Sequence, residues 1–221
     1  MILDYKTFPS GKQYVCIRDG SKRVFLRNIL FVRHPENPQQ IVVVHEWGKK
    51  TDKGMWEPPK GQMEWKELAA AGFRAGQSIT PKALVGVMQD GVLRELAEEA
   101  KIAARDLRGL ALLPISYTHP FPKAGEGAEF RYQFWTATLT DAGLQRAQRR
   151  MAAIVEHPET WDSLPADKKE KDAVTWWRPT QAPRAWSHIR GAFSHTMTSM
   201  YYAYGISMLS DAVRTDRTDK K

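Results

Sequence analysis

The chain has 221 residues, of which 42% are hydrophobic and 26% charged, and this composition excludes disordered and fibrous proteins. Its one cysteine, Cys16, excludes an internal disulfide, and we expect a buried structural thiol. Lysine and arginine number 33 against 25 acidic residues, so the formal net charge of +8 favours anionic partners such as phosphates or nucleic acid.

The basic residues are spread over several short runs. The runs at 145–150, 167–171 and 214–221 are each mixed with acidic or polar residues, so we interpret each one as solvated surface. The first residues lack a basic segment followed by a long apolar one, and no apolar run reaches the length that spans a bilayer. We therefore expect a soluble cytoplasmic protein without a membrane partner.

The first half of the chain predicts strands followed by one long helix. Residues 13–33 and 40–48 are rich in β-branched and aromatic residues, with polar turn residues between them, as is typical of strands. Residues 68–79 are rich in small residues and remain ambiguous. Thr80 followed by Pro81 is a typical N-cap and first helical residue, so we predict a helix over 81–100.

The second half continues the alternation of strands and helices. Strand patterns occupy 110–120 and 130–140, a helical pattern covers 142–157, a late strand pattern covers 172–179, and a helical pattern closes the chain over 187–213. No internal repeat is evident. This order predicts one α/β domain over residues 1–221, in a mixed layer arrangement.

The helix predicted over 81–100 carries a group of acidic residues. At about 100° per residue, Glu95, Glu98 and Glu99 fall within an arc of about 100°, while Leu96 and Ala97 lie on the other side. A solvated acidic stripe is one interpretation, because exposed like-charge pairs cost only about 0.2–0.5 kcal/mol. A metal site is the other, and it requires a phosphate-binding loop before the helix, since Mg²⁺ binds where carboxylates meet phosphates.

Two stretches on either side of that helix start carry a family signature. "GQMEWKE" (61–67) and "RELAEEAKI" (94–102) resemble the Nudix box, G-x5-E-x7-R-E-U-x-E-E-x-G-U, in which U is a bulky aliphatic residue. There are two departures from the pattern. An insertion of 19 residues separates Glu67 from Arg94, and Lys101 stands where the family has glycine. Lys101 must therefore adopt the left-handed conformation, or the helix must end differently.

The resemblance implies a fold. It is a Nudix-type α/β/α sandwich with a mixed sheet, an insertion inside the box and an added C-terminal helix. We expect the core to cover about residues 13–190, the insertion about 68–86, and the C-terminal helix and polar tail about 187–221. Part of the insertion is expected to lengthen the helix at its N-terminal end, which leaves the metal-binding end intact.

The resemblance also implies the residues of the site. It assigns Mg²⁺ or Mn²⁺ to Glu95, Glu98, Glu99 and the backbone carbonyl of Lys60. Arg94 would orient the glutamates through a bidentate contact. Gly61 and Glu67 would complete the phosphate-binding loop and support the metal ligands, with Glu64 as a competitor for the role of Glu67.

The resemblance implies that water attacks a phosphorus atom of a diphosphate linkage. The general base differs within the family, so Glu95 and a carboxylate of a later loop both stay open. In that loop Glu129 is the first choice and Glu126 the second, and a purely mobile acidic loop is the alternative reading of both. Trp56, just before the loop "EPPKG", either stacks on a base or packs in the core.

The substrate is expected to be a nucleotide-linked diphosphate. "WEPPKG" (56–61) looks more like the loop of Nudix enzymes that act on dinucleoside polyphosphates and on the messenger RNA cap than like a "PGG" loop. We therefore favour dinucleoside polyphosphates or capped RNA. Diphosphoinositol polyphosphates, ADP-ribose and nucleotide sugars remain alternatives, as does an inactive Nudix-fold protein that only binds nucleotide or RNA. The oligomeric state stays open.

Overall fold

The computed structural model describes residues 1–46, 56–157, 159, 163–164 and 170–177. The helix predicted over 187–213 and the polar tail lie outside these residues, so that part of the predicted architecture stays a prediction. None of the helices in the described ranges is both long and apolar enough to cross a membrane.

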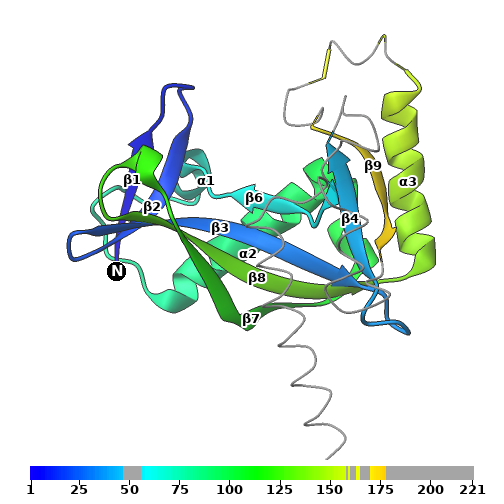
Figure 1. The fold of residues 1–221 in the computed structure, drawn as a ribbon, viewed down its shortest axis with the longest axis horizontal. Coiled ribbons are helices and arrows are strands. Elements are labelled where there is room, and N and C mark those ends of the chain that lie inside the picture. Colours follow the sequence, from blue (N-terminus) through cyan, green and yellow to red (C-terminus); the bar gives the residue numbers. More distant parts are fainter. Residues whose placement is uncertain (47–55, 158, 160–162, 165–169, 178–221) are drawn as a thin grey trace, which may run out of the picture.

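The described residues form a sheet of nine strands, with β3 at its centre (Figure 1). β3 pairs antiparallel with β2, β4 and β6, and parallel with β8 over the length of both strands. The sheet is therefore mixed. The bounds are Ile2–Thr7 for β1, Gln13–Asp19 for β2, Lys22–Arg33 for β3, Ile41–Glu46 for β4, Trp56–Glu57 for β5, Lys60–Gln62 for β6, Leu107–Pro120 for β7, Ala128–Leu139 for β8 and Lys171–Trp177 for β9.

Within the described ranges three α-helices accompany the sheet, and the starts of α2 and α3 follow from local chemistry. They are α1 (Trp65–Ala70), α2 (Pro81–Glu99) and α3 (Asp141–Val155), with short 3₁₀ turns η1 (Ala104–Asp106) and η2 (Pro122–Ala124). The side-chain oxygen of Thr80 accepts a hydrogen bond of 3.2 Å from the Ala83 N–H. Thr140 caps α3 through the Gly143 N–H in the same way. The helices predicted over 81–100 and 142–157 are confirmed.

Alternation along β3 produces an apolar layer on each face of the sheet. Leu26, Leu30 and Val32 face the layer that contains the apolar residues of α2 and α3. Phe25, Ile29 and Phe31 face the opposite layer, built with β8. Because neighbouring residues of a strand point to opposite faces, one long apolar strand supplies both layers. In Figure 1, α3 lies beside β9 at one end of the sheet. The predicted α/β fold with a mixed sheet is confirmed.

The insertion within the box joins α1 to α2 and contacts the N-terminal strand. The Leu3 N–H of β1 donates to the carbonyl oxygen of Gln77 at 2.9 Å, and the Gly76 N–H donates to the carbonyl oxygen of Leu3 at 2.8 Å. The sequence pattern does not predict β1. This strand pairs with β2 on one side and is fixed by the insertion on the other, so its place depends on long-range contacts.

Candidate active site

The loop before α1 is fixed to the central strand. Lys60, Gly61 and Gln62 form β6 and pair with Ile29, Asn28 and Arg27 of β3. A Cβ atom built on Gly61 would lie 2.0 Å from Cδ of Glu95. A side chain at position 61 would therefore force the Glu95 side chain to move, because real Cβ atoms do not approach other heavy atoms so closely. Glycine at position 61 therefore allows the Glu95 carboxylate to lie against the backbone of β6.

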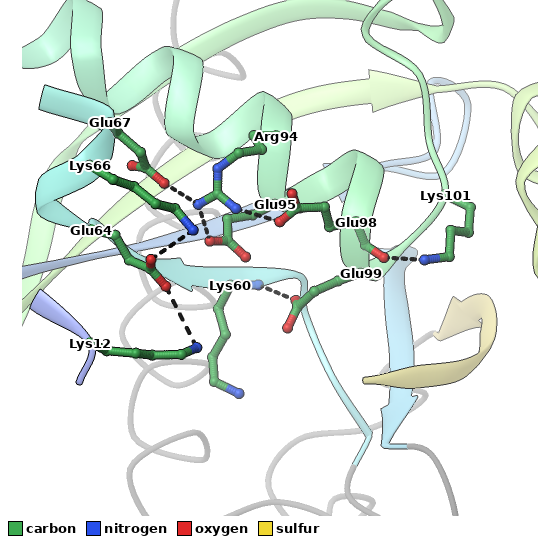
Figure 2. A network of polar contacts seen from close by, with 10 residues as sticks. All are labelled: Lys12, Lys60, Glu64, Lys66, Glu67, Arg94, Glu95, Glu98, Glu99 and Lys101. Carbon is green, nitrogen blue, oxygen red and sulfur yellow. Dashed lines mark hydrogen bonds and ion pairs between the residues drawn. The ribbon is translucent and has the colours of Figure 1, made fainter. Parts of the chain in front are cut away.

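Arg94 joins the two halves of the box (Figure 2). Its guanidinium group pairs with Glu67 of α1 and Glu98 of α2, and its Nη2 lies 2.6 Å from Oε1 of Glu95. Glu64 pairs instead with Lys66, at 2.9 Å. The structure thus brings Glu67, rather than its competitor, to Arg94. The 19-residue insertion does not separate the two halves in space.

Glu99 differs from its two neighbours in burial. It lies on the same stripe of α2 as Val92 and Leu96 and is only 4% exposed, whereas Ala97 is exposed. The expectation that Ala97 lies on the packed side of α2 is therefore wrong. Glu99 shares with Glu95 the side of α2 that faces β6: Oε2 of Glu99 accepts a hydrogen bond of 2.8 Å from the Lys60 N–H, and Glu95 lies against Gly61. The acidic pattern did not predict the burial of Glu99.

Lys101 ends the box in the left-handed conformation, with φ of 57°. This is the conformation that the glycine of the family pattern adopts most easily. The Lys101 ammonium group donates a hydrogen bond to the backbone carbonyl oxygen of Glu98. This contact satisfies one of the carbonyl groups in the last turn of α2, which have no partner within the helix. Of the two alternatives left by the sequence, the structure selects the left-handed residue.

Comparison with solved structures gives matches that include Nudix hydrolases. A Nudix hydrolase from Nitrosomonas europaea is 12% identical, covers 83% of this chain and 89% of its own, and has a TM-score of 0.39. An Ap4A hydrolase from C. elegans is 14% identical, covers 85% of this chain and 98% of its own, and has a TM-score of 0.41. A MutT Nudix hydrolase from Burkholderia pseudomallei is 12% identical, covers 78% of this chain and 100% of its own, and has a TM-score of 0.36. No family model and no curated protein matches. At these values the likeness assigns neither substrate nor residue roles.

The decisive feature is in the chain itself: Gly61, Glu67, Arg94, Glu95 and Glu98 meet as the box pattern predicts. The chain resembles the Nudix hydrolases.

The carboxylates of this Nudix box repel one another. Burial raises the pKa of Glu95 to about 8, against the pull of Arg94, and the charges of Glu99 and Glu98 raise it further. Burial also raises the pKa of Glu67. A group of partly buried carboxylates with raised pKa values is typical of sites that take up a cation or a proton.

The donor set of the box fits a hard divalent cation. Carboxylate and carbonyl oxygens are the ligands that Mg²⁺ and Mn²⁺ prefer, and Glu95, Glu98, Glu99 and the Lys60 carbonyl group supply only oxygen. In the part of the chain that the structure describes, no three acidic, histidine or cysteine side chains are gathered as a ready metal site. The three glutamates of the box have other partners here: the Arg94 guanidinium group donates to Glu95 and Glu98, and the Lys60 N–H donates to Glu99.

A buried ion-pair group adjoins the box, and the sequence did not reveal it. Nζ of Lys171 lies 2.6 Å from Oε1 of Glu57 and 3.6 Å from Oε1 of Glu99, and Lys60 also pairs with Glu57. Lys171 is 6% exposed, so the interpretation of the run 167–171 as solvated surface is wrong at this residue. Pairing of β9 with β4 carries Lys171 inward, and no pattern within the run indicates it.

The charges of this group depend on one another. Burial opposes the charge of Glu57, but the Lys60 and Lys171 ammonium groups outweigh it and lower the pKa of Glu57 below its ordinary value. Burial opposes the charge of Lys171 in turn, and Glu99 and Glu57 raise the pKa of Lys171. Lys171 therefore stays protonated, and its positive charge lies between the carboxylates of Glu57 and Glu99.

The other residues named from the sequence lie apart from Arg94. Glu129 is the second residue of β8, lies in register beside Val24, and pairs with Arg131 at 3.3 Å. Val24 is five residues from Ile29, the partner of Lys60, which places Glu129 about 16 Å along the strand from the loop. Glu126 is exposed in the preceding loop. Neither contacts the box, so their role as general base stays a prediction.

Trp56 lies at the entrance to the loop. It is half-buried on β5, and its ring centroid is 4.9 Å from that of His45. It also packs against the apolar layer that contains Phe25. These contacts give Trp56 a packing role, while stacking on a substrate base stays a prediction. Cys16 is fully buried, and burial raises its pKa to about 11, which fits the predicted structural thiol.

Proposed function

We propose that this chain is a Nudix-type hydrolase that cleaves a diphosphate linkage in a nucleotide-linked substrate, with Mg²⁺ or Mn²⁺ as cofactor. One observation carries the proposal: Arg94 contacts Glu67, Glu95 and Glu98 at once, while Glu95 lies against the backbone of Gly61. A solvated acidic stripe needs neither an arginine shared among three carboxylates nor a glycine that admits one of them. We also propose that residues 1–221 act as one domain.

Each residue of the box has a distinct task in this proposal. Glu95, Glu98, Glu99 and the carbonyl group of Lys60 would hold the cation, and Arg94 orients Glu95 and Glu98. A bound divalent cation neutralises charge on the phosphate oxygens and acidifies a water molecule. Glu95 is also the candidate general base within the box, and its raised pKa suits a group that accepts a proton near neutral pH. Glu67 holds the far side of the Arg94 guanidinium group.

Dinucleoside polyphosphates or the messenger RNA cap are the substrates that we favour. The support comes from the loop sequence "WEPPKG" and from the formal charge of +8, which attracts long anionic substrates. A panel of diphosphate compounds assayed with Mg²⁺ and with Mn²⁺ tests this choice. Faster turnover of ADP-ribose, nucleotide sugars or diphosphoinositol polyphosphates than of the favoured compounds would contradict it.

Salt and chelator together distinguish the hydrolase from a protein that only binds RNA. We expect higher salt to weaken capture of a long capped RNA steeply, through counterion release, and to affect a dinucleoside polyphosphate far less. EDTA is expected to abolish hydrolysis of both substrates. The measurements are binding and product formation at two salt concentrations, each with and without EDTA. RNA binding that survives EDTA, with no product from any diphosphate under either metal, would favour the binding protein instead.

Metal affinity is expected to depend on pH through Glu95. In the metal-free protein the pKa of Glu95 is raised to about 8 from an ordinary value of 4.5, so this group stabilises the fold most below pH 4.5 and loses that contribution as the pH rises through 8. A cation must displace the proton below pH 8, so Mn²⁺ affinity should increase by up to about tenfold per unit between pH 6.5 and 7.5. Calorimetric titration in buffers of different ionisation enthalpy measures the affinity and the released proton. Glu95→Gln should flatten this dependence, and equal slopes for both proteins would contradict it.

A further inference from the structure

On β3, Arg27 lies between buried apolar residues on one face of the sheet. On β3, Phe25, Ile29 and Phe31 point to the face opposite α2 and are fully buried. Arg27 alternates with them and must point to the same face. It is half-buried. A charged group among buried aromatic residues is unusual, because burial of a charge is costly unless the group finds partners.

The partners of Arg27 within the described residues are weak. Its Nη1 lies 3.5 Å from the Tyr132 hydroxyl group and its Nη2 lies 3.5 Å from Oε1 of Gln62, both at the outer limit of a hydrogen bond. Nε of Arg27 and Nε2 of Gln62 are buried without an acceptor. No carboxylate in the described ranges pairs with Arg27. The guanidinium group therefore keeps donors that an anion would satisfy.

Aromatic rings hold the guanidinium group in place. Its carbon lies 5.0 Å from the ring centroid of Phe130 and 5.7 Å from that of Tyr132, within the range of cation–π attraction. Tyr132, Arg27 and Gln62 are direct neighbours in register across β8, β3 and β6. They form a row of polar groups whose position is fixed by strand pairing, which is the kind of rigid support that a binding site needs.

This row adjoins the Nudix box. Gln62 follows Gly61 directly, and Gly61 contacts Glu95. Adjacent residues of a strand point to opposite faces, so the row lies on the other side of β6 from Glu95. Within the described residues β6 pairs with β3 along one edge only. Gln62 and Gly61 are consecutive residues of β6, so the row and the Glu95 carboxylate lie against the same short strand, one on each side of it.

We propose that Arg27, with Gln62 and Tyr132, binds a phosphate group of the substrate's polyphosphate chain beyond the linkage that is cleaved. The proposal rests on the hydrolase function and narrows its substrate to one with more phosphate groups than the cleaved pair requires. The planar guanidinium group matches two phosphate oxygens, and the Gln62 amide adds a further donor. Because the row lies on the other side of β6 from Glu95, Arg27 determines binding and specificity rather than the chemical step.

The test compares binding of inorganic tripolyphosphate and of adenosine, in Mg²⁺, by calorimetric titration. Arg27→Met should weaken tripolyphosphate binding by about tenfold or more, since a charge-assisted contact is lost, and leave adenosine binding unchanged. Arg27→Lys keeps the charge but not the planar fork, so a smaller loss is expected. The control is Arg23→Met, which removes the same charge from an exposed position on the same strand and should stay within about twofold.

Several outcomes would overturn the proposal. Tripolyphosphate affinity of Arg27→Met within twofold of the parent would do so, as would a loss of adenosine affinity with unchanged tripolyphosphate affinity, which would indicate contact with a base. Circular dichroism establishes folding, and if Arg27→Met does not fold, unchanged tripolyphosphate affinity of Arg27→Lys is the overturning result. A different result would contradict the proposed hydrolase function: no product from any diphosphate, although tripolyphosphate still binds and Arg27→Met still weakens that binding.

Discussion

Replacing Glu98 by glutamine is expected to lower metal-dependent hydrolysis by about a thousandfold or more, with the fold retained. A metal-binding carboxylate supplies several kcal/mol of transition-state stabilisation, and each 1.4 kcal/mol or so corresponds to about tenfold in rate. The change is nearly isosteric. Glu98 is only half-buried and pairs with Arg94. The amide group of the replacing glutamine can therefore occupy the same position at the surface of α2. Initial rates at saturating Mn²⁺, together with the Mn²⁺ affinity, measure the effect.

Asp90→Asn provides the matched control for Glu98→Gln. Asp90 lies on the same helix, is exposed, and loses the same charge on replacement. We expect its activity to stay within about twofold of the parent, because exposed charges outside the site contribute little. Activity of Glu98→Gln within a few-fold of the parent would remove Glu98 from the metal site. A similar loss in both variants would indicate a general effect of charge on α2.

Lys171→Met is expected to destabilise the protein by about 3–5 kcal/mol, the usual cost of removing one partner of a buried ion pair. The change leaves the Glu57 carboxylate with Lys60 alone, and Glu99 loses the ammonium group 3.6 Å away. Urea unfolding at pH 7 measures the free energy of unfolding. Lys22→Met is the control, since Lys22 is an exposed lysine on β3 and its loss should cost less than about 1 kcal/mol.

The stability difference between Lys171→Met and the parent should also depend on pH. The pKa of Glu57 is lowered in the folded parent, so its stabilising contribution is complete above the ordinary value of 4.5 and is lost as the pH falls below it. The difference should therefore shrink on acidification from pH 7 to 4. A difference that is constant with pH, or a loss no larger than that of Lys22→Met, would show that the Lys171 ammonium group does not stabilise these carboxylates.

Local chemistry was sufficient to predict most elements, and the resemblance to the Nudix box supplied the residues of the candidate site. Thr80 and Pro81 specify the start of α2 because a hydroxyl group and a fixed φ angle act within one turn of the chain. The box residues were found because their spacing is recorded in the sequence itself. Strand β1 was missed, since its partners β2 and residues 76–79 come from elsewhere in the chain.

The sequence by itself determined which residues form the box, where α2 begins, and that strands alternate with helices, because these depend on residues a few positions apart. Only the tertiary structure decided that Arg94 spans the insertion to reach Glu67, that Glu99 is buried, and that Lys171 and Arg27 lie beside the loop. Each of these depends on strands and helices distant in sequence being packed together. Burial decides the role of a charged residue, because a lysine exposed to water needs no partner, whereas a buried lysine destabilises the fold unless a carboxylate pairs with it.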